Sequence, residues 1–244
     1  MLVATVLLYV GLGGCAILAV AMVMQYDLHR KEPPATIISA IAGGALAMFL
    51  CMVGQDVYVQ SHPHDFDLGD VWRWALMAGG SEETAKLLVV ITVAALFRKD
   101  FDEPIDGLIY GAMAGLGAAI VESVRVQGAP MQLTSLPREE PIRLLGHLIM
   151  GGIGGYGVGL VRHVSWKLLP IALACFASAV VLHITWDVLA YRMADLAEDG
   201  RQRHFGYTFT AIATMLAGFF YFRLLVTLCP GEASARAKAP PARA

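Results

Sequence analysis

Long apolar stretches alternate with short polar connections along almost the whole chain. Seven of them approach or exceed the length of about 20 residues that a helix needs to cross a bilayer; they lie at about 2–25, 35–54, 71–97, 105–124, 142–161, 168–191 and 206–228. Because the connections are short, we expect one all-α domain over residues 1–230, a polytopic transmembrane bundle of about seven spans. Residues 231–244 are rich in Ala, Pro and Arg, so we expect a disordered polar tail there.

The composition agrees with a multi-pass integral membrane protein. Of the 244 residues, 57% are hydrophobic, and the mean hydropathy is +0.61, whereas soluble domains contain about 45–50% apolar residues. The first apolar stretch lacks a basic start and an Ala-x-Ala cleavage site, so we interpret it as a retained helix. Basic residues form no dense patch. We therefore expect the lipid bilayer as a partner and no nucleic acid.

The distribution of Lys and Arg between alternate loops predicts the orientation of the spans. The loop at 55–70 contains neither residue, and the loops on the opposite side have a small excess of both. We therefore expect the N-terminus outside and the C-terminus inside.

Four of the predicted spans contain ionisable groups at membrane depth. The third contributes two glutamates and a lysine, the fourth a glutamate, the fifth a histidine, and the sixth a histidine and an aspartate; they are Glu82, Glu83, Lys86, Glu122, His147, His183 and Asp187. An ionised side chain at that depth costs about 2.5–3.5 kcal/mol by insertion scales. Such a concentration of charge indicates chemistry rather than packing alone.

Helical spacing organises part of this set. Lys86 follows Glu82 by four residues and Glu83 by three, so it can reach either carboxylate. His183 and Asp187 are four residues apart and share one helix face. The two glutamates point about 100° apart around the helix axis, and spacing alone does not decide which of them faces the reacting atoms.

Glycines mark two of the spans that carry these groups. Gly107, Gly111 and Gly115 repeat every four residues, which lets a neighbouring helix approach closely. Gly151 continues the face of His147 in the fifth span in the same way. We therefore expect a tight bundle around a polar centre.

A count of charges constrains the chemistry of that centre. With neutral histidines, the four carboxylates give −4 and Lys86 gives +1, a sum of −3. A pocket of low dielectric constant does not tolerate this sum, so some carboxyl groups are protonated, or the histidines are charged, or a cation is bound. Two histidines and one glutamate could bind zinc as a catalytic site does, although the chain contains no H-E-x-x-H motif.

These residues resemble the sequence blocks of the PrsW family of polytopic membrane proteases. Glu82-Glu83-x-x-Lys86 is similar to its E-E-x-x-K motif, and the loop at 26–34 is similar to its signature after the first helix. The stretch 101–117 with Glu122 resembles the second block, while His147 with Gly151 and His183 with Trp186 resemble the third and fourth. The resemblance covers about residues 20–190.

The resemblance implies an intramembrane endopeptidase. Glu82, with Glu83, and His147 would activate water, and His183 would face the developing oxyanion. Asp187 stands where the wider superfamily of CAAX-prenyl endopeptidases and bacteriocin-processing proteins has Asn, and an ionised Asp cannot donate a hydrogen bond. Asp187 would therefore orient His183 or act in its protonated form.

Glu122 and Lys86 complete the set that the resemblance implies. Lys86 would tune or anchor the glutamates. Glu122 is followed by Ser123, where the family is expected to have Asn more often, so an amide role at this position is not supported. We expect catalysis without a metal, with zinc left open as the alternative.

The same resemblance implies a membrane-anchored protein as substrate, such as an anti-sigma factor in regulated proteolysis, and the bacterial inner membrane as location. The oligomeric state is not indicated. A proton-coupled carrier is an alternative, because carboxylate and histidine relays also mark transport pathways. However, the two halves of the chain show no matching broken helices. A catalytically silent scaffold is the remaining alternative, and the intact motif residues argue against it.

Overall fold

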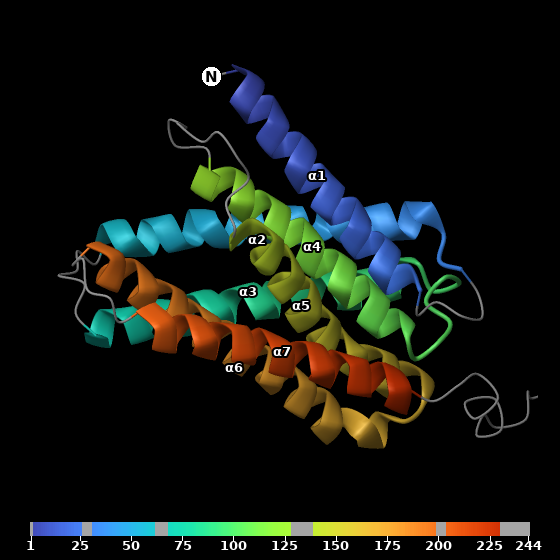
Figure 1. Ribbon diagram of the computed structural model, residues 1–244. Coiled ribbons are helices and arrows are strands. Elements are labelled where there is room, and N and C mark those ends of the chain that lie inside the picture. The colour runs from blue at the N-terminus through green and yellow to red at the C-terminus, as the bar shows by residue number, and fades with distance from the viewer. Residues whose placement is uncertain (1, 26–30, 62–67, 128–138, 199–203, 230–244) are drawn as a thin grey trace, which may run out of the picture.

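The computed structural model describes residues 2–25, 31–61, 68–127, 139–198 and 204–229, and within them the chain is helical (Figure 1). Seven α-helices follow one another: α1 (Leu2–Met24), α2 (Pro34–Ser61), α3 (Leu68–Leu96), α4 (Asp106–Gln127), α5 (Glu139–His163), α6 (Leu169–Glu198) and α7 (His204–Leu228). A short 3-10 turn, η1 (Trp166–Leu168), precedes α6. The predicted all-α class is confirmed, and the predicted tail at 231–244 lies outside the described residues.

Five of these helices are long and apolar enough to cross a membrane, namely α2, α4, α5, α6 and α7. Helix α3 has 29 residues but includes Glu82, Glu83 and Lys86, which lowers its apolar character. The predicted count of about seven spans therefore agrees with the number of helices, and five of them meet the criteria of length and composition.

Two helices form the centre of the bundle. In the apolar windows of α4 and α5, 78% and 83% of the residues are buried, against 17–22% in α2, α6 and α7. Figure 1 shows α4 and α5 running through the middle of the molecule, with α6 and α7 side by side along its lower edge. The outer helices thus present their apolar side chains outward, where lipid would surround them.

Glycines bring α4 and α5 into direct backbone contact. A Cβ atom added to Gly111 would collide with the carbonyl oxygen of Gly151, and one added to Gly155 would collide with that of Gly107. Gly115 lies against the carbonyl oxygen of His147 in the same way. The predicted role of the glycine stripe as a close helix contact is therefore confirmed, and it places α4 directly beside the histidine of α5.

Polar contacts hold the N-terminal end of α4, which lies opposite to the end that carries Glu122. The carboxylate of Asp106 accepts the backbone N–H groups of Asp102 and Glu103, both at 2.7 Å. The hydroxyl of Tyr110 contacts the buried carboxylate of Glu32, just before α2. These contacts tie the α3–α4 connection and the segment before α2 to α4, and they leave Asp106 outside the cluster described next.

Candidate functional site

The acidic turn of α3 points into the bundle, with the side chains of Glu82, Glu83 and Lys86 all buried. Lys86 Nζ donates a hydrogen bond to Glu83 Oε1 at 2.5 Å. Glu82 has a different partner, because Gln55 Nε2 of α2 donates to its Oε1 atom at 3.0 Å. The two adjacent glutamates therefore have separate environments, one paired with a cation and one with an amide.

Helix α6 places His183 against this turn. Its Nδ1 atom lies 2.7 Å from Glu83 Oε1, where a carboxylate accepts an imidazole N–H. That bond directs the opposite ring nitrogen, Nε2, towards Glu82 Oε2 at 3.6 Å and Asp187 Oδ2 at 3.7 Å. A series of three contacting side chains results, in which the cation of Lys86 fixes the carboxylate of Glu83 and this carboxylate fixes the imidazole of His183.

Helices α4 and α5 provide a second series of contacting side chains of the same kind. Arg143 Nη1 lies 3.3 Å from Glu122 Oε1, and Glu122 Oε2 lies 2.8 Å from His147 Nε2. Arg143 precedes His147 by four residues, so both side chains lie on one face of α5. Each histidine of the cluster is therefore held by a carboxylate that is itself held by a cation.

The two series of side chains meet where the imidazole rings of His147 and His183 approach each other. The ring centroids of His147 and His183 are 5.1 Å apart and nearly perpendicular. With Glu82, they form a buried group whose potential ligand atoms all lie within 4.8 Å of one another. Glu82 Oε2 and His147 Nδ1 are buried without a hydrogen-bond partner among the described residues, and such atoms are costly unless something binds them.

The donor set fits a divalent metal. Two imidazoles and one carboxylate are the ligands of several catalytic zinc sites, and metal-bound histidines usually donate their other N–H to a carboxylate, as the pairing of His183 with Glu83 allows. The charges agree as well. Glu82, Glu83, Glu122 and Asp187 give −4, Lys86 and Arg143 give +2, and a divalent cation would bring the sum to zero.

All seven residues singled out in the sequence lie in this cluster, and two further ones join them. Arg143 could have been found from its spacing of four residues to His147, and its contribution changes the charge sum from −3 to −2. Gln55 could have been found as a buried polar residue on α2. It lies just past the end of the apolar run that we assigned to that span.

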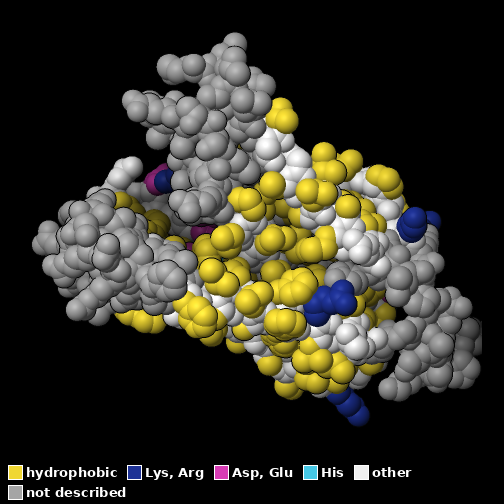
Figure 2. Space-filling view, in the orientation of Figure 1, with side chains coloured by type: hydrophobic (Ala, Val, Ile, Leu, Met, Phe, Trp, Pro, Cys, Tyr) yellow, Lys and Arg dark blue, Asp and Glu magenta, His cyan; other side chains and the backbone are white. Residues whose placement is uncertain are grey.

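The cluster opens towards the end of the bundle where α4 and α6 end and α3 and α5 begin. Its innermost residues are buried, whereas the side chains of Glu122 and Asp187 are 27% and 18% exposed. Figure 2 shows acidic side chains at the left of the molecule, where these helix ends lie, and a broad hydrophobic surface beyond them. Water can thus reach the cluster from this end.

Comparison with known proteins gives one match. The sequence model of the PrsW family intramembrane metalloproteases matches residues 32–221, a range that includes every residue of the cluster. No curated protein and no solved structure matches the chain. The description of this family as metalloproteases agrees with the group of Glu82, His147 and His183, whereas the sequence alone had favoured catalysis without a metal and left zinc open.

Proposed function

Because the chain belongs to the PrsW family of intramembrane metalloproteases, we propose that it is a zinc-dependent endopeptidase that cleaves membrane-anchored proteins. The observation that supports this most directly is the buried approach of Glu82, His147 and His183, in which one carboxylate oxygen and one imidazole nitrogen have no hydrogen-bond partner among the described residues. The family match establishes a membrane protease; the zinc ion, the roles of single residues and the substrate are our proposals.

In this proposal Glu82, His147 and His183 hold the metal. A bound zinc ion polarises a carbonyl group and makes water more acidic. Glu83 and Glu122 orient the two imidazoles, and Lys86 and Arg143 keep those carboxylates ionised and in place. Gln55 fixes the remaining oxygen of Glu82, so that its Oε2 atom faces the histidines.

Asp187 is the carboxylate that remains for proton transfer. Its Oδ2 atom lies 3.7 Å from His183 Nε2, and the side chain is partly exposed, so it can contact water at the cluster. We assign to it the removal of a proton from the attacking water and its delivery to the leaving amide nitrogen, as general acid–base catalysis requires. This role replaces the orienting role that the sequence had left open for this residue.

The side from which water enters defines where cleavage takes place. The cluster opens at the end where α3 and α5 begin, and the expected orientation with the N-terminus outside assigns this end to the outer face. We propose that the protein lies in a bacterial cell membrane. We also propose that its protease domain is a single unit that extends to about residue 230. An anti-sigma factor whose outer part must be removed is the class of substrate that this arrangement suits.

The metal is tested by its content and by chelation. Purified protein is expected to contain about one zinc ion per chain, and His147→Ala or His183→Ala is expected to lose it at a chelator concentration that the wild type withstands. His163→Ala, at the other end of α5, is the matched control. Membranes containing the chain are expected to lose cleavage of their own anchored proteins on chelation and to regain it with zinc. Cleavage that continues in metal-free protein would refute zinc dependence.

Arg143 gives a second test, because it acts through Glu122 on His147. Arg143→Met is expected to lower cleavage and zinc affinity by about 10–100-fold, the usual effect of removing an outer partner of a metal ligand. Arg143→Lys is expected to restore part of both. Arg125→Met removes an exposed ion pair with Asp56, and such pairs contribute about 0–1 kcal/mol, so it serves as control. Equal zinc affinity in Arg143→Met and Arg125→Met would exclude this role.

A further inference from the structure

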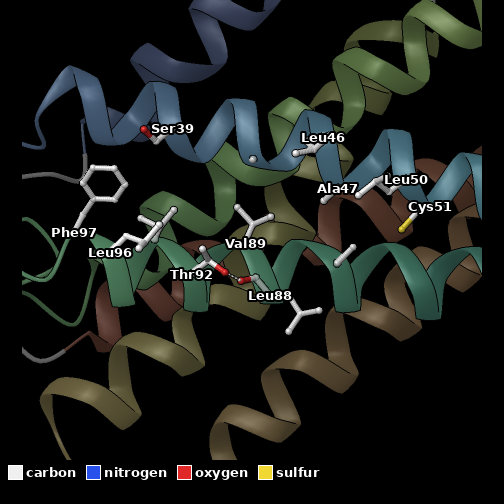
Figure 3. A pocket seen from close by; sticks show the side chains of 13 residues that line it. Ser39, Leu46, Ala47, Leu50, Cys51, Leu88, Val89, Thr92, Leu96 and Phe97 are labelled. Carbon is white, nitrogen blue, oxygen red and sulfur yellow. Dashed lines mark hydrogen bonds between the residues drawn. The ribbon is translucent and has the colours of Figure 1, made fainter.

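A groove between α2 and α3 lies on the outer surface of the bundle. It has a volume of about 560 Å³ and is lined by residues of both helices and by Phe97 (Figure 3). The leucines at its rim are open to the surroundings, with Leu46 61% and Leu88 57% exposed. The groove is therefore accessible sideways, from the plane of the membrane.

The α2 wall of the groove consists of small residues. Ser39, Gly43, Ala47 and Cys51 follow one another at intervals of four residues and line it together. A Cβ atom added to Gly43 would lie 2.9 Å from a methyl group of Val89, so the two helices meet at this point and form the floor. Small residues in such a row let a further helix approach closely in a membrane.

The side-chain hydroxyl groups in the groove are satisfied within their own helices. Ser39 Oγ donates to the carbonyl oxygen of Ala35 at 2.8 Å. Thr92 Oγ1 donates to that of Leu88, also at 2.8 Å (Figure 3). Neither hydroxyl is left to require a polar partner, and none of the described residues that line the groove is charged. Its chemistry thus matches an apolar occupant.

The groove adjoins the metal-binding group. On α3, Val89 lies seven residues after Glu82 and within about 20° of it around the helix axis, and Val89 lines the groove. On α2, Cys51 lines the groove and lies one helical turn before Gln55, which holds Glu82. The same two helix faces therefore continue from the groove into the cluster.

The length of the groove matches half of a bilayer. From Ser39 to Cys51 the α2 wall rises through 12 residue steps, or about 18 Å at 1.5 Å per residue. Half of the hydrocarbon core is about 15 Å. The groove begins at the depth of the cluster and continues to the end of the bundle opposite to the opening of the site.

We propose that this groove binds the inner half of the substrate's apolar transmembrane helix and presents the middle of that helix to Glu82, His147 and His183. The inference rests on the proposed peptidase activity and adds the surface that recognises the substrate. It also predicts where the cut lies. About 12 apolar residues, those that occupy the groove, remain on the inner side of the scissile bond, so in an apolar segment of about 20 residues cleavage falls just to the outer side of its middle.

Filling the groove tests the proposal. Ala47→Phe is expected to lower the yield of new N-termini that depend on Glu82 by about tenfold or more, which corresponds to about 1.4 kcal/mol of binding free energy. Ala42→Phe is the matched control, because Ala42 is exposed on the same helix and does not line the groove. Equal yields in the two variants, at matched folded abundance, would overturn the proposal.

A photoreactive phenylalanine derivative at position 47 of the Glu82→Gln chain, with position 42 as control, identifies the occupant directly. The expected products from position 47 join it to the apolar segments of the same proteins that the wild type cleaves. Products with lipid alone, or with a second copy of the chain, would refute the proposal.

A third test uses the wild-type chain alone and measures where its substrates are cut within their apolar segments. Cuts at the outer or inner end of apolar segments would also refute docking in the groove. Absence of any Glu82-dependent terminus would instead contradict the peptidase activity itself, so the two failures can be distinguished.

Discussion

Replacing Glu82 with Gln is expected to abolish cleavage of membrane-anchored proteins, with a loss of at least about 10³-fold relative to the wild type. Gln has nearly the same shape as Glu and can still fill the space beside Gln55. It removes the negative charge and weakens the ligand that faces His183 Nε2 at 3.6 Å. Because the neighbouring Glu83 keeps its contacts with Lys86 and His183, the variant is expected to insert and fold.

The measurement compares new N-termini of membrane proteins in cells that carry either chain at matched abundance. Glu103→Gln is the matched control, since Glu103 is a buried glutamate at the opposite end of the bundle. Termini that appear with the wild type and with Glu103→Gln, and disappear with Glu82→Gln, would agree with the proposed role. Full cleavage by Glu82→Gln would exclude Glu82 as a metal ligand.

The second large effect is expected on folding. Gly111→Leu introduces a side chain where even a Cβ atom would collide with the backbone of Gly151, so α4 and α5 must separate. Overpacking of a well-packed core costs about 1–3 kcal/mol and sometimes more, and we expect the upper end because backbone atoms cannot rotate away. Separation of the helices also moves Glu122 away from His147.

The folded fraction of Gly111→Leu is measured by thermal unfolding in detergent and by resistance to proteolysis. Gly54→Leu is the control on an outer helix, because an added Cβ at Gly54 would meet no atom of the described residues within 4 Å. We expect the control to melt close to the wild type. Equal melting temperatures of the two variants would show that the α4–α5 contact does not require glycine.

Much of the fold could be predicted, because membrane helices are marked by apolar length. The fourth span was predicted at about 105–124, and α4 extends over Asp106–Gln127. The second was predicted to end near residue 54, whereas α2 continues to Ser61. The apolar run stops at Gln55, so a criterion of hydrophobicity ends the span there. The helix continues beyond that point, because the side chain of Gln55 is buried inside the bundle, where it contacts Glu82.

The sequence was sufficient to predict most of the residues of α3 to α6 that carry the site, but it predicted only some of the contacts between them. The contact of Glu83 with Lys86 lies within one helix turn and follows from spacing. The contact of Glu83 with His183 joins residues 100 positions apart, and no helical period encodes which faces of α3 and α6 meet. The pairing of His147 with Glu122 and Arg143 required the packing of α4 on α5 for the same reason.

The preference for a metal also arose only from geometry. In the sequence, the excess negative charge allowed protonated carboxyl groups, charged histidines or a cation. In the structure, Glu82 and His147 lie close to His183, Glu82 Oε2 and His147 Nδ1 have no hydrogen-bond partner among the described residues, and both histidines are held by outer carboxylates. This arrangement favours the cation among the three alternatives.

The most direct test of this account is a structure of the purified protein with zinc, with anomalous scattering recorded at the zinc edge. The account predicts one zinc ion bound by Glu82, His147 and His183, with zinc–nitrogen distances of about 2.0–2.1 Å. An ion held elsewhere, or direct hydrogen bonds that close this group without an ion in a protein that still cleaves its substrate, would contradict it.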